Sequence, residues 1–159
     1  AEEIEAELRA AARVQKLLFR EGALTHELLA RELSERQRFR NARQVGNYFG
    51  LCPSESSSAE RRRLGSITKH GNPRLRRLMV ELAWRISRFQ RRYRAARRWG
   101  AVLQDPKAYA GARKKAIVAL ARRLAVDLWR IATGRVQPEE LGLVRKVNVG
   151  RLERWPLCT

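Results

Sequence analysis

Hydroxyl and cationic side chains gather in residues 56–72, which offer the chain's best candidates for chemistry. This segment reads "SSSAERRRLGSITKHGN" and holds four serines, three arginines, one lysine and two glycines. A serine becomes a nucleophile only where its proton is taken up and nearby cations stabilise the charge that develops on the attacked group. The residues alone leave two interpretations open: a solvated, charged linker or a loop built around a reacting hydroxyl.

Positive charge dominates the middle of the chain. The net charge of the 159 residues is +19, and residues 36–135 carry 26 Lys/Arg against five Asp/Glu, a net of +21. Such a density repels itself unless polyanions are near, so nucleic acid is the leading partner. An anionic membrane is the rival partner, but the sequence has no run of 18 apolar residues and we expect no membrane attachment.

Helical spacing of apolar residues recurs along the chain, and no alternating strand pattern of useful length is present. We place helices at residues 1–21, 24–33, 42–49, 73–99 and 112–134. Asn41 and Asn72 are expected to cap the third and fourth of these, and Pro73 suits a first helical position. Ile117, Leu120, Leu124, Leu128 and Ile131 define the expected buried face of the last one.

The expected fold is an all-α domain of about five helices in a compact bundle. It has a basic loop at residues 53–68 and a weakly structured C-terminal tail from residue 135 onward. Residues 1–21 would form an amphipathic helix for oligomerisation or an interdomain contact. Residues 22–135 would form the serine-bearing domain, and residues 136–159 the tail.

Metal ligands are sparse in this chain. Its two cysteines and two histidines do not form a zinc pattern, and the five acids of residues 36–135 include no compact carboxylate pair. We therefore predict that the chain itself binds no metal or other cofactor. Cys52 is interpreted as a buried small apolar residue rather than a rival nucleophile. His70 remains an alternative as a general base for a serine.

A longer stretch, about residues 15–135, resembles a known family, and residues 38–84 carry the most specific motifs. "RFRNARQVGNYFGLCPSESSSAERRRLGSITKHGNPRLRRLMVELAW" is similar to the C-terminal domain of the IS-110 (IS-116/IS-110/IS-902) insertion-sequence transposases. The front of the pattern is matched by Arg38, Phe39, Asn41, Arg43, Gln44, Gly50, Leu51, Pro53 and Ser54. The back is matched by Gly65, Ile67, Thr68, Lys69, Gly71, Asn72, Leu75, Arg76, Glu81, Ala83 and Trp84. One departure is Ala59, where family members usually have glycine after the serine.

The resemblance implies a DNA recombinase that works with a structured guide RNA. In this family an N-terminal RuvC-like domain supplies four acidic residues that bind Mg²⁺, and the C-terminal domain supplies a serine that becomes linked to the DNA phosphate. Ser58 maps to that serine, with Ser57 as the alternative register. The implied partners are DNA, a guide RNA, the RuvC-like domain and a second copy of the protein, in a prokaryotic cytoplasm.

Several cations surround the implied nucleophile in the sequence. Arg61, Arg62, Arg63 and Lys69 could stabilise the phosphorane oxygens, and Asn72 with Arg74 could hold a neighbouring phosphate near a helix N-terminus. Arg76 and Arg77 complete the expected nucleic-acid-binding set. Two alternatives remain, a non-catalytic basic helical module that binds DNA or RNA and a degenerate transposase remnant. Trp84, Trp99 and Trp129 are interpreted as core or partner-helix contacts rather than base-stacking platforms.

Overall fold

The computed structural model describes residues 28–29, 31–32, 38–58 and 61–144. Its elements are α3 (Ala42–Tyr48), β1 (Pro53–Ser58), β2 (Arg61–Ile67), α4 (Pro73–Phe89), α5 (Arg94–Gln104), α6 (Ala110–Ala132) and the 3₁₀ helix η1 (Pro138–Leu141). The helix expected at residues 1–21 lies outside the described residues. Residues 28–29 and 31–32 are helical, within the segment expected at 24–33.

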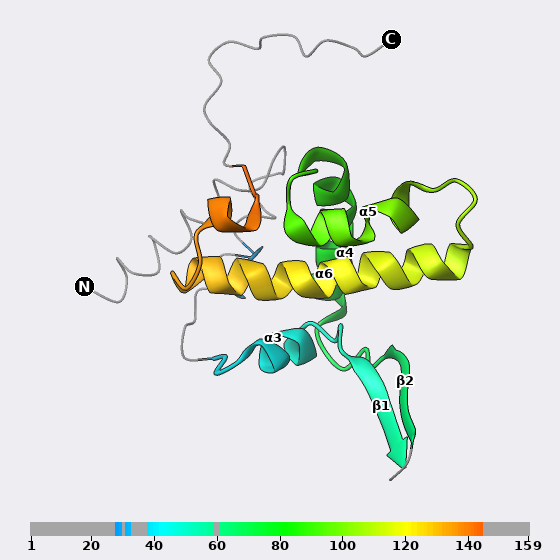
Figure 1. The fold of residues 1–159 in the computed structure, drawn as a ribbon. Helices are drawn as coiled ribbons and strands as arrows, with labels where there is room; N and C mark the ends of the chain where they lie inside the picture. The colour runs from blue at the N-terminus through cyan, green and yellow to red at the C-terminus, as the bar shows by residue number, and fades with distance from the viewer. Residues whose placement is uncertain (1–27, 30, 33–37, 59–60, 145–159) are drawn as a thin grey trace.

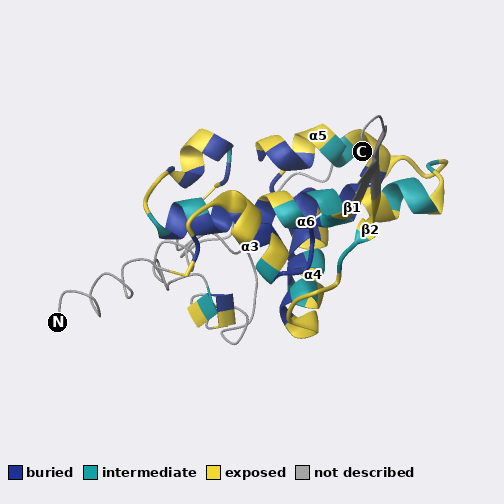
Figure 2. Cartoon of the chain, turned by 90° about the horizontal axis from the view of Figure 1, so that it is seen from below, coloured by how far each residue is buried: buried dark blue, intermediate teal, exposed yellow. Residues whose placement is uncertain are grey.

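Helix α6 forms the centre of the domain. Figure 1 shows it running between α5 and η1 on one side and α3 and the two strands on the other. Its expected apolar face is confirmed, because all five of the predicted residues are at most 4% exposed. Burying side chains of this size contributes about 1.5–3 kcal/mol each. Figure 2 shows buried residues along much of α6 and along the parts of α4 and α5 that face it.

Two asparagine caps start the helices that flank the strands, as predicted. The side chain of Asn41 accepts a 3.0 Å hydrogen bond from the backbone N–H of Gln44 and so begins α3. Asn72 accepts a 2.9 Å bond from the N–H of Arg74 and begins α4, with Pro73 at the first helical position. Each cap satisfies a backbone donor that the helix itself leaves unpaired.

The single helix predicted over residues 73–99 is wrong. The chain leaves the helix after Phe89 and re-enters it at Arg94, which gives two helices that both pack on α6. Hydrogen bonds from two buried side chains hold the segment between these helices. The side chain of Gln90 binds the backbone N–H and C=O of Val144, and the hydroxyl of Tyr93 donates to Asp127 of α6. These tertiary bonds outweigh the helical pattern of the segment. Phe89, the last residue of α4, is 57% exposed.

In place of the expected loop at residues 53–68, β1 and β2 pair as an antiparallel hairpin. The prediction missed the strands because serines and arginines at successive positions give no apolar alternation. Two further hydrogen bonds join the two sides of the hairpin at its base. Ser54 donates from its hydroxyl to the carbonyl of Ser66 at 2.9 Å, and the N–H of Thr68 donates to the carbonyl of Cys52 at 2.9 Å. Cys52 is buried, which confirms its interpretation as a small apolar residue.

The first part of the predicted weak tail is ordered against the core, so that prediction is wrong for residues 136–144. Val136, Leu141 and Leu143 are buried. Helix η1 has a capping box between Gln137 and Glu140. The two bonds from Gln90 to Val144 join this segment to the end of α4. Residues 145–159 lie outside the described residues.

Candidate functional site

The backbone register of the hairpin brings serines and arginines together. Ser58 is the last residue of β1 and pairs with Arg61, the first residue of β2. Figure 1 shows both strands extending away from the helices. Each of the three consecutive serines stands opposite one of the three arginines, in the pairs Ser58–Arg61, Ser57–Arg62 and Ser56–Arg63. The folded backbone therefore gathers the predicted nucleophile and three of its predicted cations at one end of the hairpin.

The remaining predicted site residues lie at the other end of the hairpin. Pro53 pairs with Ile67 there. Ser58 is five residues along β1 from this pair, or about 16 Å at the rise of a β-strand. The structure thus separates Ser58 from a group that we call the base cluster, which consists of Lys69, Asn72, Arg74, Arg76 and Arg77. His70 is next to Lys69 in the chain and therefore lies at the base of the hairpin. In this structure it is too far from Ser58 to act as its general base.

Lys69 adopts a left-handed backbone conformation, with a φ of 56°, and it is the one non-glycine residue with positive φ in the part of the chain that is described. Such a conformation costs on the order of 1–3 kcal/mol and persists only where neighbours hold it. Two donors hold it here: Nη1 of Arg76 and the N–H of Gly71 both donate to the carbonyl oxygen of Lys69 at 3.1 Å. The side chain of Lys69 is exposed, so a constrained backbone presents a cation to solvent.

Two glycines let the base cluster pack against the end of α3. A Cβ added to Gly71 would collide with the carbonyl oxygen of Tyr48 and lie 2.8 Å from the backbone nitrogen of Gly50. Gly50 has a φ of 64°, and a Cβ on it would lie 2.9 Å from Nη1 of Arg76. Both positions therefore require glycine, and together they fix the strand-to-helix connection at the end of α3.

The start of α4 presents the rest of the base cluster. The Oδ1 atom of Asn72 is engaged as the helix cap, so only its amide N–H groups remain to bind a phosphate. Arg74 and Arg77 are exposed, whereas Arg76 is half-buried against Lys69. The positive end of the helix dipole reinforces the two exposed arginines. This end of the hairpin is suited to hold a backbone phosphate.

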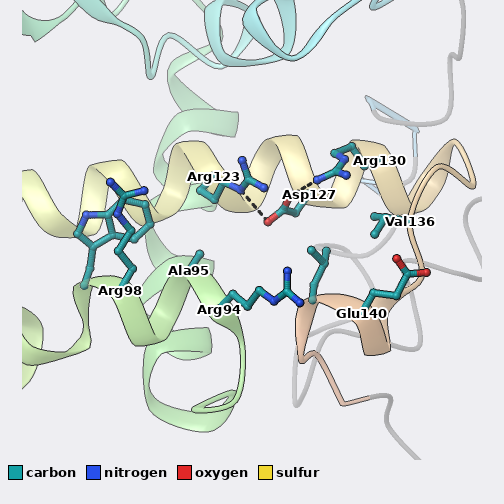
Figure 3. A pocket seen from close by; sticks show the side chains of 10 residues that line it. Arg94, Ala95, Arg98, Arg123, Asp127, Arg130, Val136 and Glu140 are labelled. Atoms are coloured by element: carbon teal, nitrogen blue, oxygen red, sulfur yellow. Dashed lines mark hydrogen bonds and ion pairs between the residues drawn. The ribbon is translucent and has the colours of Figure 1, made fainter.

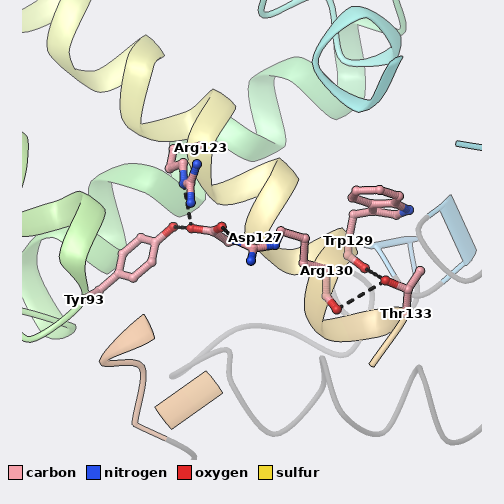
Figure 4. Close-up of polar contacts among 6 residues, drawn as sticks. All are labelled: Tyr93, Arg123, Asp127, Trp129, Arg130 and Thr133. Atoms are coloured by element: carbon pink, nitrogen blue, oxygen red, sulfur yellow. Dashed lines mark hydrogen bonds and ion pairs between the residues drawn. The ribbon is translucent and has the colours of Figure 1, made fainter. Parts of the chain in front are cut away.

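A buried polar network, absent from our sequence predictions, fixes α5 against α6 (Figure 4). Asp127 is 1% exposed and accepts hydrogen bonds from the hydroxyl of Tyr93 at 2.7 Å, Nε of Arg123 at 3.1 Å and Nη1 of Arg130 at 3.4 Å. Burial, and then the neighbouring carboxylate, raise the pKa of Tyr93 above its ordinary value. An aspartate on the apolar face of the helix, with arginines four positions before and three after, is the sequence signal for this network.

The described residues hold neither a metal-binding cluster nor a membrane-spanning helix. Within the described ranges, no three His, Cys, Asp or Glu side chains gather closely enough to bind a metal ion. None of the helices described is long and apolar enough to cross a membrane. The buried Trp129 belongs to the core as predicted, while Trp99 is half-buried and Trp84 is 37% exposed.

Comparisons with known proteins show which family this part of the chain is similar to. Residues 22–98, which include the hairpin and the base cluster, match the model of the Transposase IS116/IS110/IS902 family. The match agrees with the resemblance to this family that the sequence shows.

Three curated relatives carry transposase names. A Pseudomonas aeruginosa protein named as a family 20 transposase is 34% identical over 88 residues, which are 54% of this chain and 26% of that protein. Two Sinorhizobium fredii proteins named as transposases, y4qE and y4rJ, are 46% identical over 55 residues and 38% identical over 100 residues. These matches cover 35% and 62% of this chain, and 14% and 24% of the relatives. The matched part is thus about a quarter or less of each relative. No solved structure matches significantly.

Proposed function

We propose that this chain supplies the serine of an IS-110-type DNA transposase and recombinase. Ser58 attacks a DNA phosphate, forming a serine–phosphate bond and releasing the 3′ oxygen of the cut strand. The resulting 5′-phosphoserine linkage conserves the energy of the broken bond for strand exchange. The match to the transposase family and the positive net charge support a role on nucleic acid, and the pairing of the serine with an arginine supports this chemistry.

The pairing of Ser58 with Arg61 is the observation on which this proposal mainly rests. Directly paired residues of an antiparallel ladder share a face, and residues alternate between faces along a strand. The register therefore assigns Arg61 and Arg63 to the face of Ser58 and Arg62 to the opposite face. Arginine at two register positions on the face of the serine would suit the stabilisation of a five-coordinate phosphate.

The base cluster has a separate role in this proposal. It lies about 16 Å from Ser58 along the hairpin. One DNA strand rises about 3.4 Å per nucleotide, so this span corresponds to about five nucleotides. We assign the exposed Lys69, Arg74 and Arg77 to a phosphate at that distance from the cut. The base cluster would thus position the strand while the other end of the hairpin carries out the reaction.

The Mg²⁺ that the family resemblance implies does not fit the residues described here, since no cluster of ligating side chains is present among them. The metal site and the acceptor of the Ser58 proton are therefore assigned to the acidic RuvC-like domain. By itself this chain should bind nucleic acid and cleave it poorly. A guide RNA and a second copy of the protein complete the proposed assembly.

Covalent capture tests the proposed nucleophile. The chain, joined to a family RuvC-like domain, is incubated with Mg²⁺, element-derived RNA and end-labelled DNA and then run on a denaturing gel. We expect a labelled protein band with the unchanged protein and with Ser57→Ala, and none with Ser58→Ala. All three proteins should bind DNA with similar affinity. Binding without a covalent band in any of them would instead favour a non-catalytic module or an inactive remnant.

A further inference from the structure

A pocket of about 580 Å³ lies between α5, α6 and η1. It is on the opposite side of α6 from α3 and the hairpin (Figure 1), and none of the predicted site residues lines it. Figure 3 shows four arginine side chains around it, Arg94 and Arg98 from α5 and Arg123 and Arg130 from α6. The pocket is therefore a second basic site with its own set of residues.

The charges that line this pocket leave a cationic excess. The four arginines face two carboxylates, Asp127 and Glu140. Asp127 is buried and shared by Arg123 and Arg130, so its charge is already neutralised. Glu140 accepts a hydrogen bond from the N–H of Gln137 within the capping box of η1. Arg94 and Arg98 make no ion pair with any residue of the described part, which leaves their guanidinium groups able to bind an anion.

Two further features suit this pocket to a phosphate group. Arg94 and Ala95, the first two residues of α5, line it, and the N-terminus of that helix has no side-chain cap. The N–H groups of an uncapped helix start and the helix dipole both attract anions. Trp99 also lines the pocket, with the guanidinium carbon of Arg98 5.3 Å from the centre of its ring. An aromatic ring beside arginines is a common arrangement where bases and phosphates bind together.

We infer that this pocket binds a phosphate group, and that its source is a second nucleic-acid segment. The inference rests on the proposed function only in taking nucleic acid as the source of the phosphate. The position of the pocket has a functional consequence, because α6 separates it from the hairpin. One domain can hold one strand at the hairpin and a separate segment, either RNA or DNA, across α6.

Arginine side-chain NMR tests the pocket in the unchanged 159-residue chain. Inorganic phosphate is titrated while the Nε–H resonances are followed. We expect the signals of Arg94 and Arg98 to shift together and to saturate, and that of Arg97 to stay still. Arg97 is the internal control, because it is exposed on the same helix but does not line the pocket. Equal and unsaturable shifts of all exposed arginines would overturn the inference.

Variants identify the source of the phosphate. The double variant Arg94→Gln/Arg98→Gln is compared with Arg88→Gln/Arg97→Gln, which removes the same charge outside the pocket. For a single-stranded RNA or DNA oligonucleotide, the pocket variant should reduce the slope of log affinity against log salt by about 1–2, and the control variant should leave it unchanged. Equal losses in the two variants would contradict a nucleic-acid site here.

A small phosphorylated ligand is the other source of the same chemistry. Saturable binding of inorganic phosphate, combined with no effect of the pocket variant on oligonucleotide binding, would overturn the nucleic-acid source. The outcome is independent of the hairpin, since neither double variant touches Ser58 or the base cluster. Loss of covalent capture by Ser58→Ala with no phosphate at the pocket would support the proposed function and refute this inference.

Discussion

Nη1 of Arg76 donates a 3.1 Å hydrogen bond to the carbonyl oxygen of Lys69 and thereby holds a left-handed residue at the base of the hairpin. This bond gives Arg76 a structural role that its neighbour Arg77 lacks. Helix α4 is joined through it to the segment that follows β2. The direction of the hairpin relative to the helices therefore depends in part on one arginine.

The two adjacent arginines should respond differently to substitution. Arg76→Gln removes one of the two hydrogen bonds to the carbonyl oxygen of Lys69 and should lower the free energy of unfolding by about 0.5–1.5 kcal/mol. Arg77→Gln removes an exposed charge and should change that free energy by less than about 0.5 kcal/mol. Urea unfolding of both variants checks this. Equal losses of stability would show that Arg76 does not hold the base cluster.

Two glycines should respond to alanine in opposite directions. Gly71→Ala places a Cβ against the backbone of Tyr48. Such overpacking should lower the free energy of unfolding by about 1–3 kcal/mol or more. Gly100 lies inside α5, where the nearest atom to an added Cβ is the Gln104 amide nitrogen at 4.0 Å. Gly100→Ala should therefore stabilise the domain by about 0.5–1 kcal/mol. Thermal unfolding of the pair gives the sign directly.

Many features of the fold could be predicted from the sequence, because they depend on local signals. The caps at Asn41 and Asn72 and the buried face of α6 are of this kind. The hairpin was missed because its strands are polar and are defined by pairing with each other. The break before α5 was missed because bonds from Gln90 and Tyr93 to residues 54 and 34 positions away decide it.

The predicted site residues are arranged differently from what a loop would allow. The family resemblance placed Ser58, the arginines and Lys69 in one segment, and a loop would have let them meet. Strand pairing instead assigns the arginines to one end of the hairpin and Lys69 to the other. Spacing along the sequence contains no such information, because the same 17 residues can fold as a loop or as two strands.

The stability of the fold should decrease at alkaline pH because of the buried hydroxyl of Tyr93. Its pKa is raised in the folded state, so the unfolded chain releases this proton first as the pH rises past about 10. The hydrogen bond to Asp127 thus stabilises the fold below pH 10, and its contribution is lost at higher pH. Tyr93→Phe should lower the free energy of unfolding by about 1–3 kcal/mol at pH 7. This difference in free energy between the variant and the unchanged protein should become smaller above pH 10.

Denaturant unfolding across pH 7–12 measures this narrowing. Tyr109→Phe is the matched control, because Tyr109 is 80% exposed. We expect the control to differ from the unchanged protein by a constant amount over the whole range. If the difference in unfolding free energy between Tyr93→Phe and the unchanged protein stays constant or widens above pH 10, the raised pKa of the Tyr93 hydroxyl is contradicted.

The length of the hairpin sets the position of the phosphate held by the base cluster. Substituting an uncharged methylphosphonate at one position of the DNA strand should weaken binding most when it lies about five nucleotides from the cut. The same substitution should have little further effect in Lys69→Ala, because the contact is already lost. A binding assay at several salt concentrations, repeated along the strand, tests this. A maximal effect only at the cut itself would refute the separate role of the base cluster.

Identification of the residue that carries the DNA is the most direct test of the central claim. The covalent protein–DNA product is digested with nuclease and protease, and the modified peptide is sequenced by mass spectrometry. We predict that the nucleotide adduct lies on Ser58, the residue paired with Arg61 at the end of β1. An adduct on Ser56, Ser57 or any residue outside the hairpin would contradict this account.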